Sequence, residues 1–163
     1  MSAMSYNCHG AGGDATVREL RDLAKKYAPT VLCLLETQLH KTRVEGLARS
    51  LGFDKCFAVS SSGRSGGLGL FWNTDNTEIE ILPFSQYHID AMVTEVGKDP
   101  WRLTAVYGEA QTNERFKTWD MLKYIRSASS LPWMCLGDFN EVLHRHEHVG
   151  VQERSHASNR GLA

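Results

Sequence analysis

The sequence predicts an α/β protein with two sheets and helices on the outside, and three observations support this. Strand-like and helix-like segments alternate early in the chain, whereas the middle is rich in strand-like segments. Apolar residues recur at every second position in Ile89, Ala91 and Val93, which is typical of antiparallel strands with one covered face. The 163 residues suit one domain, and 42% hydrophobic residues allow a sizeable core.

The first segments predict a strand, a helix and a buried strand. Residues 4–8 have the composition of a short strand. Thr16 and Glu19 have the spacing of a capping box at a helix start, and Pro29 ends this helix. The apolar run over residues 30–35 predicts a strand that is buried on both faces.

The remaining elements are a helix, strands, a further helix and a last strand. Apolar positions from Val44 to Leu51 predict one helix, which Gly52 ends. Apolar and aromatic residues at helical spacing predict another helix over residues 112–129, before Pro132. The predicted strands here are residues 55–60, 68–72, 77–82, 87–95, 102–107 and 133–136.

The end of the chain has a different character. After Leu143 neither the strand nor the helix period continues, so residues 145–163 are expected to form an irregular tail. His144, His146 and His148 invite a zinc-site interpretation, but their spacing in a polar segment without a nearby cysteine favours an ordinary polar tail.

Charge and cysteine usage limit the partners and the compartment. The formal net charge is −1, so the overall charge gives no sign of a nucleic-acid partner, although a local basic face stays open. No segment approaches the about 18 apolar residues of a membrane span, and no signal peptide is evident, so no membrane partner is expected. Cysteines that are far apart, without a CxxC motif, favour reduced thiols in an intracellular compartment.

The most informative local pattern is Gly137-Asp138-Phe139-Asn140, which follows an apolar strand. Residues two apart point the same way in an extended chain, so Asp138 and Asn140 could converge on one phosphate and its attacking water. The alternative is an Asx turn that simply closes the strand, and the pattern by itself favours that alternative.

Three further polar residues stand at predicted strand ends. Glu36 ends an apolar run, where a carboxylate is costly to bury without a partner or a metal. Asn7 could instead be part of an ordinary turn, and Tyr107 could be a packing residue. Because sites gather at strand ends in layered α/β folds, the set together indicates a functional site.

Two other patterns carry open alternatives. His88 and Asp90 share a strand face, which fits acid–base chemistry or a surface cross-strand pair. The Ser/Gly segment over residues 60–67 could contact phosphates through backbone N–H groups, but it lacks the P-loop lysine pattern and favours a hairpin loop.

Five segments in order carry a family resemblance over roughly residues 4–154. The chain resembles the endonuclease/exonuclease/phosphatase superfamily and is most similar to the endonuclease domain of plant LINE-type (non-LTR) retrotransposons. Trp101, Trp119 and Trp133 lie in stretches that add to the likeness to the retrotransposon domain. The five segments are Ser5-Tyr6-Asn7-Cys8-His9-Gly10, Leu35-Glu36-Thr37, Ser65-Gly66-Gly67-Leu68-Gly69-Leu70, Val106-Tyr107-Gly108-Glu109 and Gly137-Asp138-Phe139-Asn140.

The resemblance implies a four-layer α/β sandwich, in which two mainly antiparallel sheets lie face to face between outer helices. It also implies a DNA substrate, a nuclear location and a Mg²⁺ or Mn²⁺ ion at Glu36, with Asn7 nearby. In this comparison Asp138 orients or deprotonates the attacking water, and Asn140 holds the phosphate or the aspartate. Tyr107 reaches the phosphate in the transition state.

The sequence also departs from the family pattern. Tyr6 and His9 stand where the family usually has tryptophan and arginine. Family members continue with further strands, a metal-site aspartate and a Ser-Asp-His motif that stabilises the phosphate, and no Ser-Asp-His occurs here. The expectation is one domain over residues 1–163 that lacks its last strands and has impaired catalysis.

Three functions therefore stay open at this point. The first is a metal-dependent endonuclease that nicks DNA. The second is a phosphoesterase that acts on small phosphate esters, and the third is a non-catalytic remnant with weak or no nucleic-acid binding. The sequence gives no oligomeric state.

Overall fold

The computed structural model describes residues 1–142, which divide into two compact units. The first unit comprises Met1–Tyr107 and Leu131–Asp138, and it contains both sheets. The second unit comprises Gly108–Ser130 and the chain from Phe139 onward. Within residues 1–142, no helix combines the length and apolar character that crossing a membrane requires.

The first sheet has the strand order β1-β2-β4-β3 and is almost wholly apolar at its centre. β1 runs parallel to β2, and the other two pairings are antiparallel. Every residue of β2 and β4 is buried, which confirms the two-sided burial expected from the apolar run after Pro29. The strands are β1 (Ala3–Asn7), β2 (Val31–Leu35), β4 (Leu68–Trp72) and β3 (Lys55–Val59).

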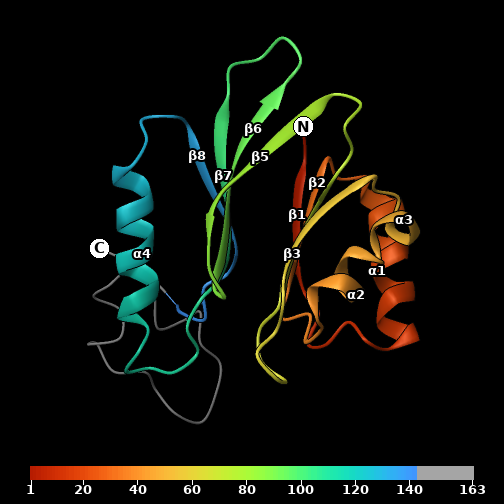
Figure 1. Ribbon diagram of the computed structural model, residues 1–163, viewed down its shortest axis with the longest axis horizontal. Helices are drawn as coiled ribbons and strands as arrows, with labels where there is room; N and C mark the ends of the chain where they lie inside the picture. Colours follow the sequence, from red (N-terminus) through yellow and green to blue (C-terminus); the bar gives the residue numbers. More distant parts are fainter. Residues whose placement is uncertain (143–163) are drawn as a thin grey trace. The chain divides into compact units, whose positions relative to one another are not determined.

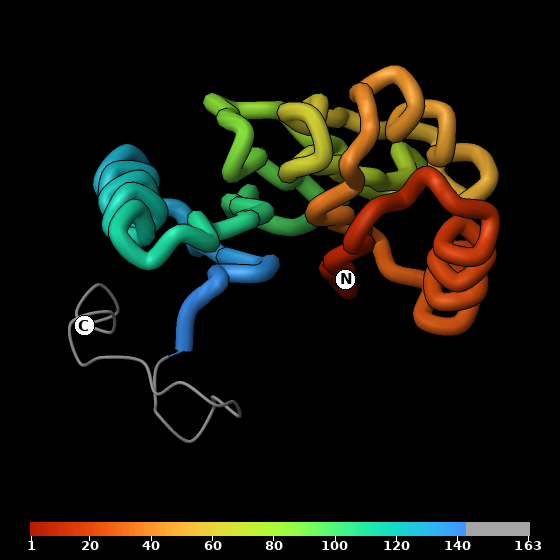
Figure 2. Tube along the Cα trace, turned by 90° about the horizontal axis from the view of Figure 1, so that it is seen from below, coloured from red at the N-terminus to blue at the C-terminus, as the bar shows by residue number. Residues whose placement is uncertain are grey.

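Three helices cover the face of the first sheet that points away from the second sheet (Figure 1). The long helix α1 (Asp14–Tyr27) buries Leu20 and Ala24 and is seen end-on beside this sheet in Figure 2. The predicted capping box is wrong, because α1 starts after Gly13, whose position makes no side-chain capping bond. Thr16 thus lies inside the first turn.

The predicted helix from Val44 to Leu51 is two short helices, α2 (Lys41–Glu45) and α3 (Ala48–Leu51). His40 caps α2, since its side chain accepts from the backbone N–H of Thr42. Gly52 ends α3 with φ of 87°, a left-handed conformation that glycine adopts without steric cost, so the predicted helix end is confirmed.

The second sheet has the order β5-β6-β7-β8 and is also mixed. β5, β6 and β7 pair antiparallel, whereas β7 and β8 run parallel. The predicted alternation is confirmed in β6, where Ile89, Ala91 and Val93 all pack into the core between the two sheets. The strands are β5 (Thr77–Phe84), β6 (His88–Glu95), β7 (Trp101–Tyr107) and β8 (Trp133–Asp138).

Two apolar clusters hold the first unit together. One lies between the first sheet and its helices and contains Leu32, Leu34 and Phe71. The other lies between the two sheets and contains Leu35, Leu70 and Leu103. Two mixed sheets of four strands each, packed face to face with helices outside, confirm the predicted α/β sandwich.

The second unit contains the helix α4 (Phe116–Ser127), which is shorter than the predicted 112–129. The Trp119 and Phe139 rings are stacked, with centroids 6.0 Å apart and planes within 3°. Arg115 is paired with Glu141 at 3.3 Å. The predictions for the three clustered histidines and the irregular tail lie outside the described residues.

The cysteine prediction can be checked, because all four cysteines lie in the described part of the chain. All four are free. Burial raises the pKa of the Cys33 thiol to about 12, and burial likewise raises the pKa of Cys8 to about 12. Both thiols therefore stay protonated and behave as small apolar side chains.

Candidate active site

A hydrogen bond joins the carboxyl ends of β1 and β8. The Asn7 side-chain Nδ2 donates to Asp138 Oδ2 at 3.1 Å, although the two residues are 131 positions apart in sequence. Side chains alternate along a strand, so Asn7 lies on the same side of β1 as Ala3, and Asp138 on the same side of β8 as Leu136. Ala3 and Leu136 both pack in the core between the sheets. The polar pair therefore forms one end of that core.

Tyr107 lies directly beside Asp138 in the second sheet. The two residues are register partners in the parallel β7–β8 pair, so both side chains lie on the same sheet face. Tyr107 is half-buried and packs against the core between the sheets. Gly137 makes this pairing possible, because a Cβ at this position would collide with the backbone of Val106.

Glu36 follows β2 and is held by two neighbours that the sequence analysis did not assign to the site. The Gln38 Nε2 donates to Glu36 Oε1 at 3.3 Å, and His9 Nδ1 lies 3.3 Å from Glu36 Oε2. The Glu36 side chain is only 15% exposed, whereas that of His9 is 87% exposed. In the sequence, only the two-residue spacing of Glu36 and Gln38 indicated that these two side chains could contact each other.

The backbone around Glu36 has an uncommon conformation. His9, Glu36 and Gln38 have φ of 49°, 51° and 55°, in the left-handed region that costs non-glycine residues of order 1–3 kcal/mol. Neighbouring backbone bonds hold this conformation, since Gly10 N–H donates to Glu36 O at 2.9 Å and Thr37 N–H donates to a carbonyl in the Ser/Gly loop. Such strain is typical of segments that position functional groups.

Asn140 lies in the second unit, where its Nδ2 donates to Gly108 O at 2.7 Å. β8 ends at Asp138, and Asn140 has φ of 50°, so the extended backbone assumed for the Asp138–Asn140 pair stops at Asp138. The convergence of these two side chains on one phosphate stays a prediction.

His88 and Asp90 lie on one strand face, and the structure contradicts the surface-pair alternative proposed for them. Both residues are buried, so they are not a surface pair. Arg102 donates to both carboxylate oxygens of Asp90, and Thr104 donates to Oδ1 at 2.9 Å. His88 Nδ1 instead lies 2.7 Å from Ser85 Oγ. Asp90 thus belongs to a buried ion pair.

The donor atoms at the strand ends suit a hard divalent cation. Within residues 1–142, no three His, Cys, Asp or Glu side chains gather at metal-binding distance. Glu36 supplies one carboxylate, and Asn7 adds an amide oxygen, Oδ1, which accepts from His9 N–H at 3.1 Å. This small set fits Mg²⁺, which keeps several waters and usually takes one or two carboxylates together with substrate phosphates.

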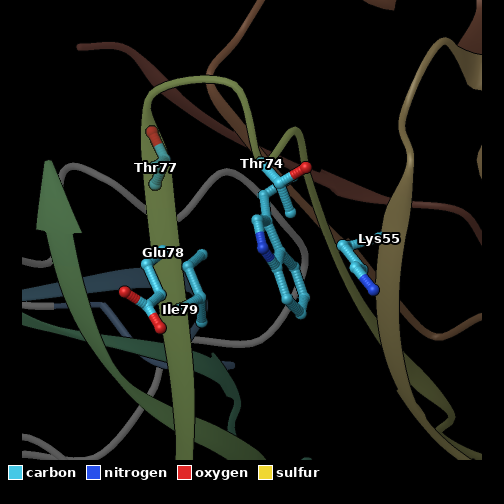
Figure 3. A pocket seen from close by; sticks show the side chains of 6 residues that line it. Lys55, Thr74, Thr77, Glu78 and Ile79 are labelled. Atoms are coloured by element: carbon cyan, nitrogen blue, oxygen red, sulfur yellow. The ribbon is translucent and has the colours of Figure 1, made fainter. Parts of the chain in front are cut away.

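A separate pocket of about 490 Å³ opens at the opposite end of the strands (Figure 3). Lys55 begins β3, Thr77 begins β5 and Trp72 ends β4, whereas the candidate site lies at the ends of β1 and β8. No predicted site residue lines this pocket. Its lining residues are Lys55, Trp72, Thr74, Thr77, Glu78 and Ile79.

The geometry defines a two-sheet α/β protein with amide, carboxylate and phenol groups at one end of its central core. A family model described as Endonuclease/Exonuclease/phosphatase family matches residues 4–161, and the chain therefore belongs to this family. A comparison with curated proteins found no match.

Solved structures with the same fold include several DNA-processing proteins. The chain is similar to D. rerio TDP2 complexed with single strand DNA product (22% identity, TM-score 0.67, 87% of this chain and 61% of that one). It is also similar to AP endonuclease LMAP from Leishmania major, with 17% identity and a TM-score of 0.67 over 93% of this chain and 58% of that one. A third similar structure is an AP endonuclease from Archaeoglobus fulgidus, with 12% identity and a TM-score of 0.72 over 99% of this chain and 68% of that one. The chain thus spans about three fifths of the first two proteins.

Proposed function

We propose that this chain is a Mg²⁺- or Mn²⁺-dependent phosphodiesterase of the DNA-nicking endonuclease type. The observation that carries the proposal is the Asn7–Asp138 hydrogen bond of 3.1 Å, which joins the two sheets at the end where Tyr107 lies beside Asp138. Hydrolysis of a phosphodiester requires a base for the attacking water and donors for the phosphate oxygens. The side chains of Asn7, Tyr107 and Asp138 supply a carboxylate base and hydrogen-bond donors.

Asp138 takes the proton from the attacking water in this proposal. The Asn7 amide holds Asp138 Oδ2 and so fixes the rotation of the carboxylate. The Tyr107 hydroxyl donates to a non-bridging oxygen of the phosphate, where negative charge increases in the transition state. The family resemblance assigns to Asn140, whose Nδ2 donates to Gly108 O, the role of holding the phosphate or the aspartate.

Glu36 and Asn7 are the residues that would hold the divalent cation. When bound, the cation would neutralise charge at the phosphate and at the leaving oxygen. The contacts of Gln38 and His9 with the two carboxylate oxygens keep Glu36 in one orientation. The left-handed backbone at Glu36 ends the regular strand geometry of β2 directly at this residue.

Two kinds of evidence support DNA as the substrate. Two of the similar solved structures hold DNA products, namely single strand DNA in D. rerio TDP2 and a DNA hairpin in the 3' phosphatase NExo from Neisseria. The ordered motifs and the tryptophan-containing stretches support descent from a LINE-type retrotransposon, which would place the activity in the nucleus.

A plasmid-nicking assay with Mg²⁺ tests the proposal. The unmutated chain should convert supercoiled plasmid to the open circle, and Asp138→Asn should lower the rate by on the order of 10²–10⁴. Glu36→Gln should lower it as well and should raise the Mg²⁺ concentration needed. Glu80→Gln, at an exposed position on β5, is the matched control.

Absence of nicking by the unmutated chain at high concentration would refute the endonuclease function and support the non-catalytic alternative. Release of phosphate from small phosphate esters, without nicking, would support the small-ester alternative. Equal nicking by the chain and by Asp138→Asn would show that a contaminating nuclease cuts the plasmid.

A further inference from the structure

The turn between β5 and β6 is held rigidly at the same end of the second sheet as Tyr107. Ser85 N–H donates to His88 O at 2.9 Å, and Tyr87 N–H donates to Ser85 Oγ at 3.0 Å. Ser85 Oγ also lies 2.7 Å from Nδ1 of the buried His88 ring. Three contacts therefore fix a turn of only a few residues.

This rigid turn exposes two large aromatic side chains. Phe84 is 53% exposed and Tyr87 is 40% exposed. Phe84 is held on one side by Phe57 of β3, with ring centroids 4.9 Å apart at an angle of 66°. An exposed aromatic ring held in one orientation has already lost much of its conformational entropy, which favours binding to a flat partner.

The two aromatic residues continue a row that begins at the candidate site. Tyr107 N–H donates to Tyr87 O at 2.8 Å, so the β6–β7 ladder extends to Tyr87 and places its side chain on the Tyr107 face. Tyr107 is in turn the register partner of Asp138. Phe84 pairs with Ile89, which packs in the core between the sheets, so Phe84 lies on this face as well.

The order along this edge of the sheet is therefore Asp138 on β8, Tyr107 on β7, Tyr87 before β6 and Phe84 on β5. Neighbouring strands lie about 4.8 Å apart, so Tyr87 is about two strand spacings from Asp138. That separation suits a nucleotide next to the phosphate under attack. The polar half of the row would hold the phosphate, and the aromatic half would meet a base.

We propose that Phe84 and Tyr87 form a stacking surface for an unpaired nucleobase adjacent to the scissile phosphate. The inference rests on the proposed phosphodiesterase function and specifies its substrate as single-stranded or locally unpaired nucleic acid. Base–aromatic stacking tolerates any sequence, because every base has a π-face. The formal net charge of −1 gives no overall attraction to phosphates, and stacking adds affinity that does not depend on charge.

The test is an equilibrium titration of a single-stranded oligonucleotide that carries 2-aminopurine, with the full chain in EDTA so that no cleavage occurs. Tyr87→Leu and Phe84→Leu should each raise the Kd about 5-fold or more, the effect of losing one stacked base. Tyr87→Phe keeps the ring and should bind like the unmutated chain. Binding to a fully paired duplex should change less, because its bases are already stacked.

Tyr27→Leu is the matched control, since Tyr27 is 56% exposed at the end of α1, remote from the edge that carries Tyr107. A weakened Kd in Tyr27→Leu equal to that in Tyr87→Leu would overturn the inference, and so would unchanged binding in both Leu variants of the turn. Lack of measurable binding by the unmutated chain would also overturn it. An equal loss of affinity for a strand of abasic sugar-phosphates would show that the rings do not contact bases.

The titration separates failure of this inference from failure of the proposed function. Nicking that depends on Asp138, together with binding that is insensitive to Phe84 and Tyr87, refutes only the stacking surface. Ring-dependent binding by a chain that does not nick DNA refutes only the catalytic function.

Discussion

The two sheets of the first unit both bury most of their central strands, but they do so through different chemistry. In the first sheet, β2 and β4 are buried at every position, and apolar clusters cover both faces. In the second sheet, the face turned away from the inter-sheet core carries the buried polar residues Asp90, Arg102 and Thr104. The stability of the first sheet thus depends on close apolar packing, whereas that of the second sheet also depends on hydrogen bonds and ion pairs between its buried polar side chains.

The same contrast extends to the candidate site. Glu36 reaches its position through the strained segment after β2, where Glu36 and Gln38 both have positive φ. Tyr107 and Asp138 need no unusual backbone, because the regular parallel register of β7 and β8 sets them side by side. One half of the site is therefore positioned by loops and the other half by strand pairing.

The largest expected effect tests the polar side of this comparison. Asp90→Ala should lower the free energy of unfolding by about 3–5 kcal/mol, because it leaves the Arg102 guanidinium buried without its carboxylate. Urea unfolding measures the loss. The double variant Asp90→Ala/Arg102→Met should be more stable than the single one, since it removes the uncompensated charge.

The ion pair between Lys98 and Glu95 is the matched control, and Lys98→Ala should change stability little, because the Lys98 side chain is 57% exposed and pairs open to solvent contribute little. A loss in Asp90→Ala no larger than in Lys98→Ala would show that the second sheet does not depend on its buried ion pair.

The next effect tests the apolar side of the comparison. Leu34→Ala should lower the free energy of unfolding by about 2–5 kcal/mol, because Leu34 is fully buried between the first sheet and its helices and the truncation leaves a cavity. Met134→Ala on β8 is the control, since Met134 is 44% exposed and should cost within about 0.5 kcal/mol. Similar urea midpoints for the two variants would contradict the tight packing assigned to the first sheet.

Strand positions could be predicted from the sequence because apolar composition and two-residue alternation are local signals. They predicted β2 and β6 closely, along with Glu36 and Tyr107 at strand ends. The start of α1 was wrong because Thr16 and Glu19 match a capping box by spacing alone, whereas the chain enters the helix at Gly13. Local spacing does not determine which of several possible turns the backbone takes.

Partners across strands could not be predicted from the sequence. The pattern His88-x-Asp90 suggested a pair on one strand, but the partner of Asp90 is Arg102 on the neighbouring β7. Finding it requires the β6–β7 register, in which Asp90 faces Thr104 and Met92 faces Arg102. The Asn7–Asp138 bond likewise requires the packing of two sheets. Order along the chain indicated these site residues without giving their contacts.

The smallest expected effect concerns the pH dependence of the second sheet. Burial of His88 lowers its pKa below the ordinary value of 6.5, although the Asp90 carboxylate opposes this shift and the Pro83 carbonyl accepts from the ring. Arg102 adds to the lowering. Because the folded pKa is below the unfolded one, the neutral ring's contribution is complete above about pH 6.5 and is lost as the pH falls toward the folded pKa.

Urea unfolding between pH 5 and pH 8 should therefore show stability that declines below about pH 6.5, with a shallower decline in His88→Gln. His40→Asn is the control, because His40 is exposed and asparagine can still cap α2. Parallel pH profiles for the chain and for His88→Gln would show that His88 titrates normally. Such a result would leave the Asp90–Arg102 ion pair as the buried polar group on which the stability of the second sheet depends, whereas the backbone N–H bonds of the turn before His88 would be unaffected.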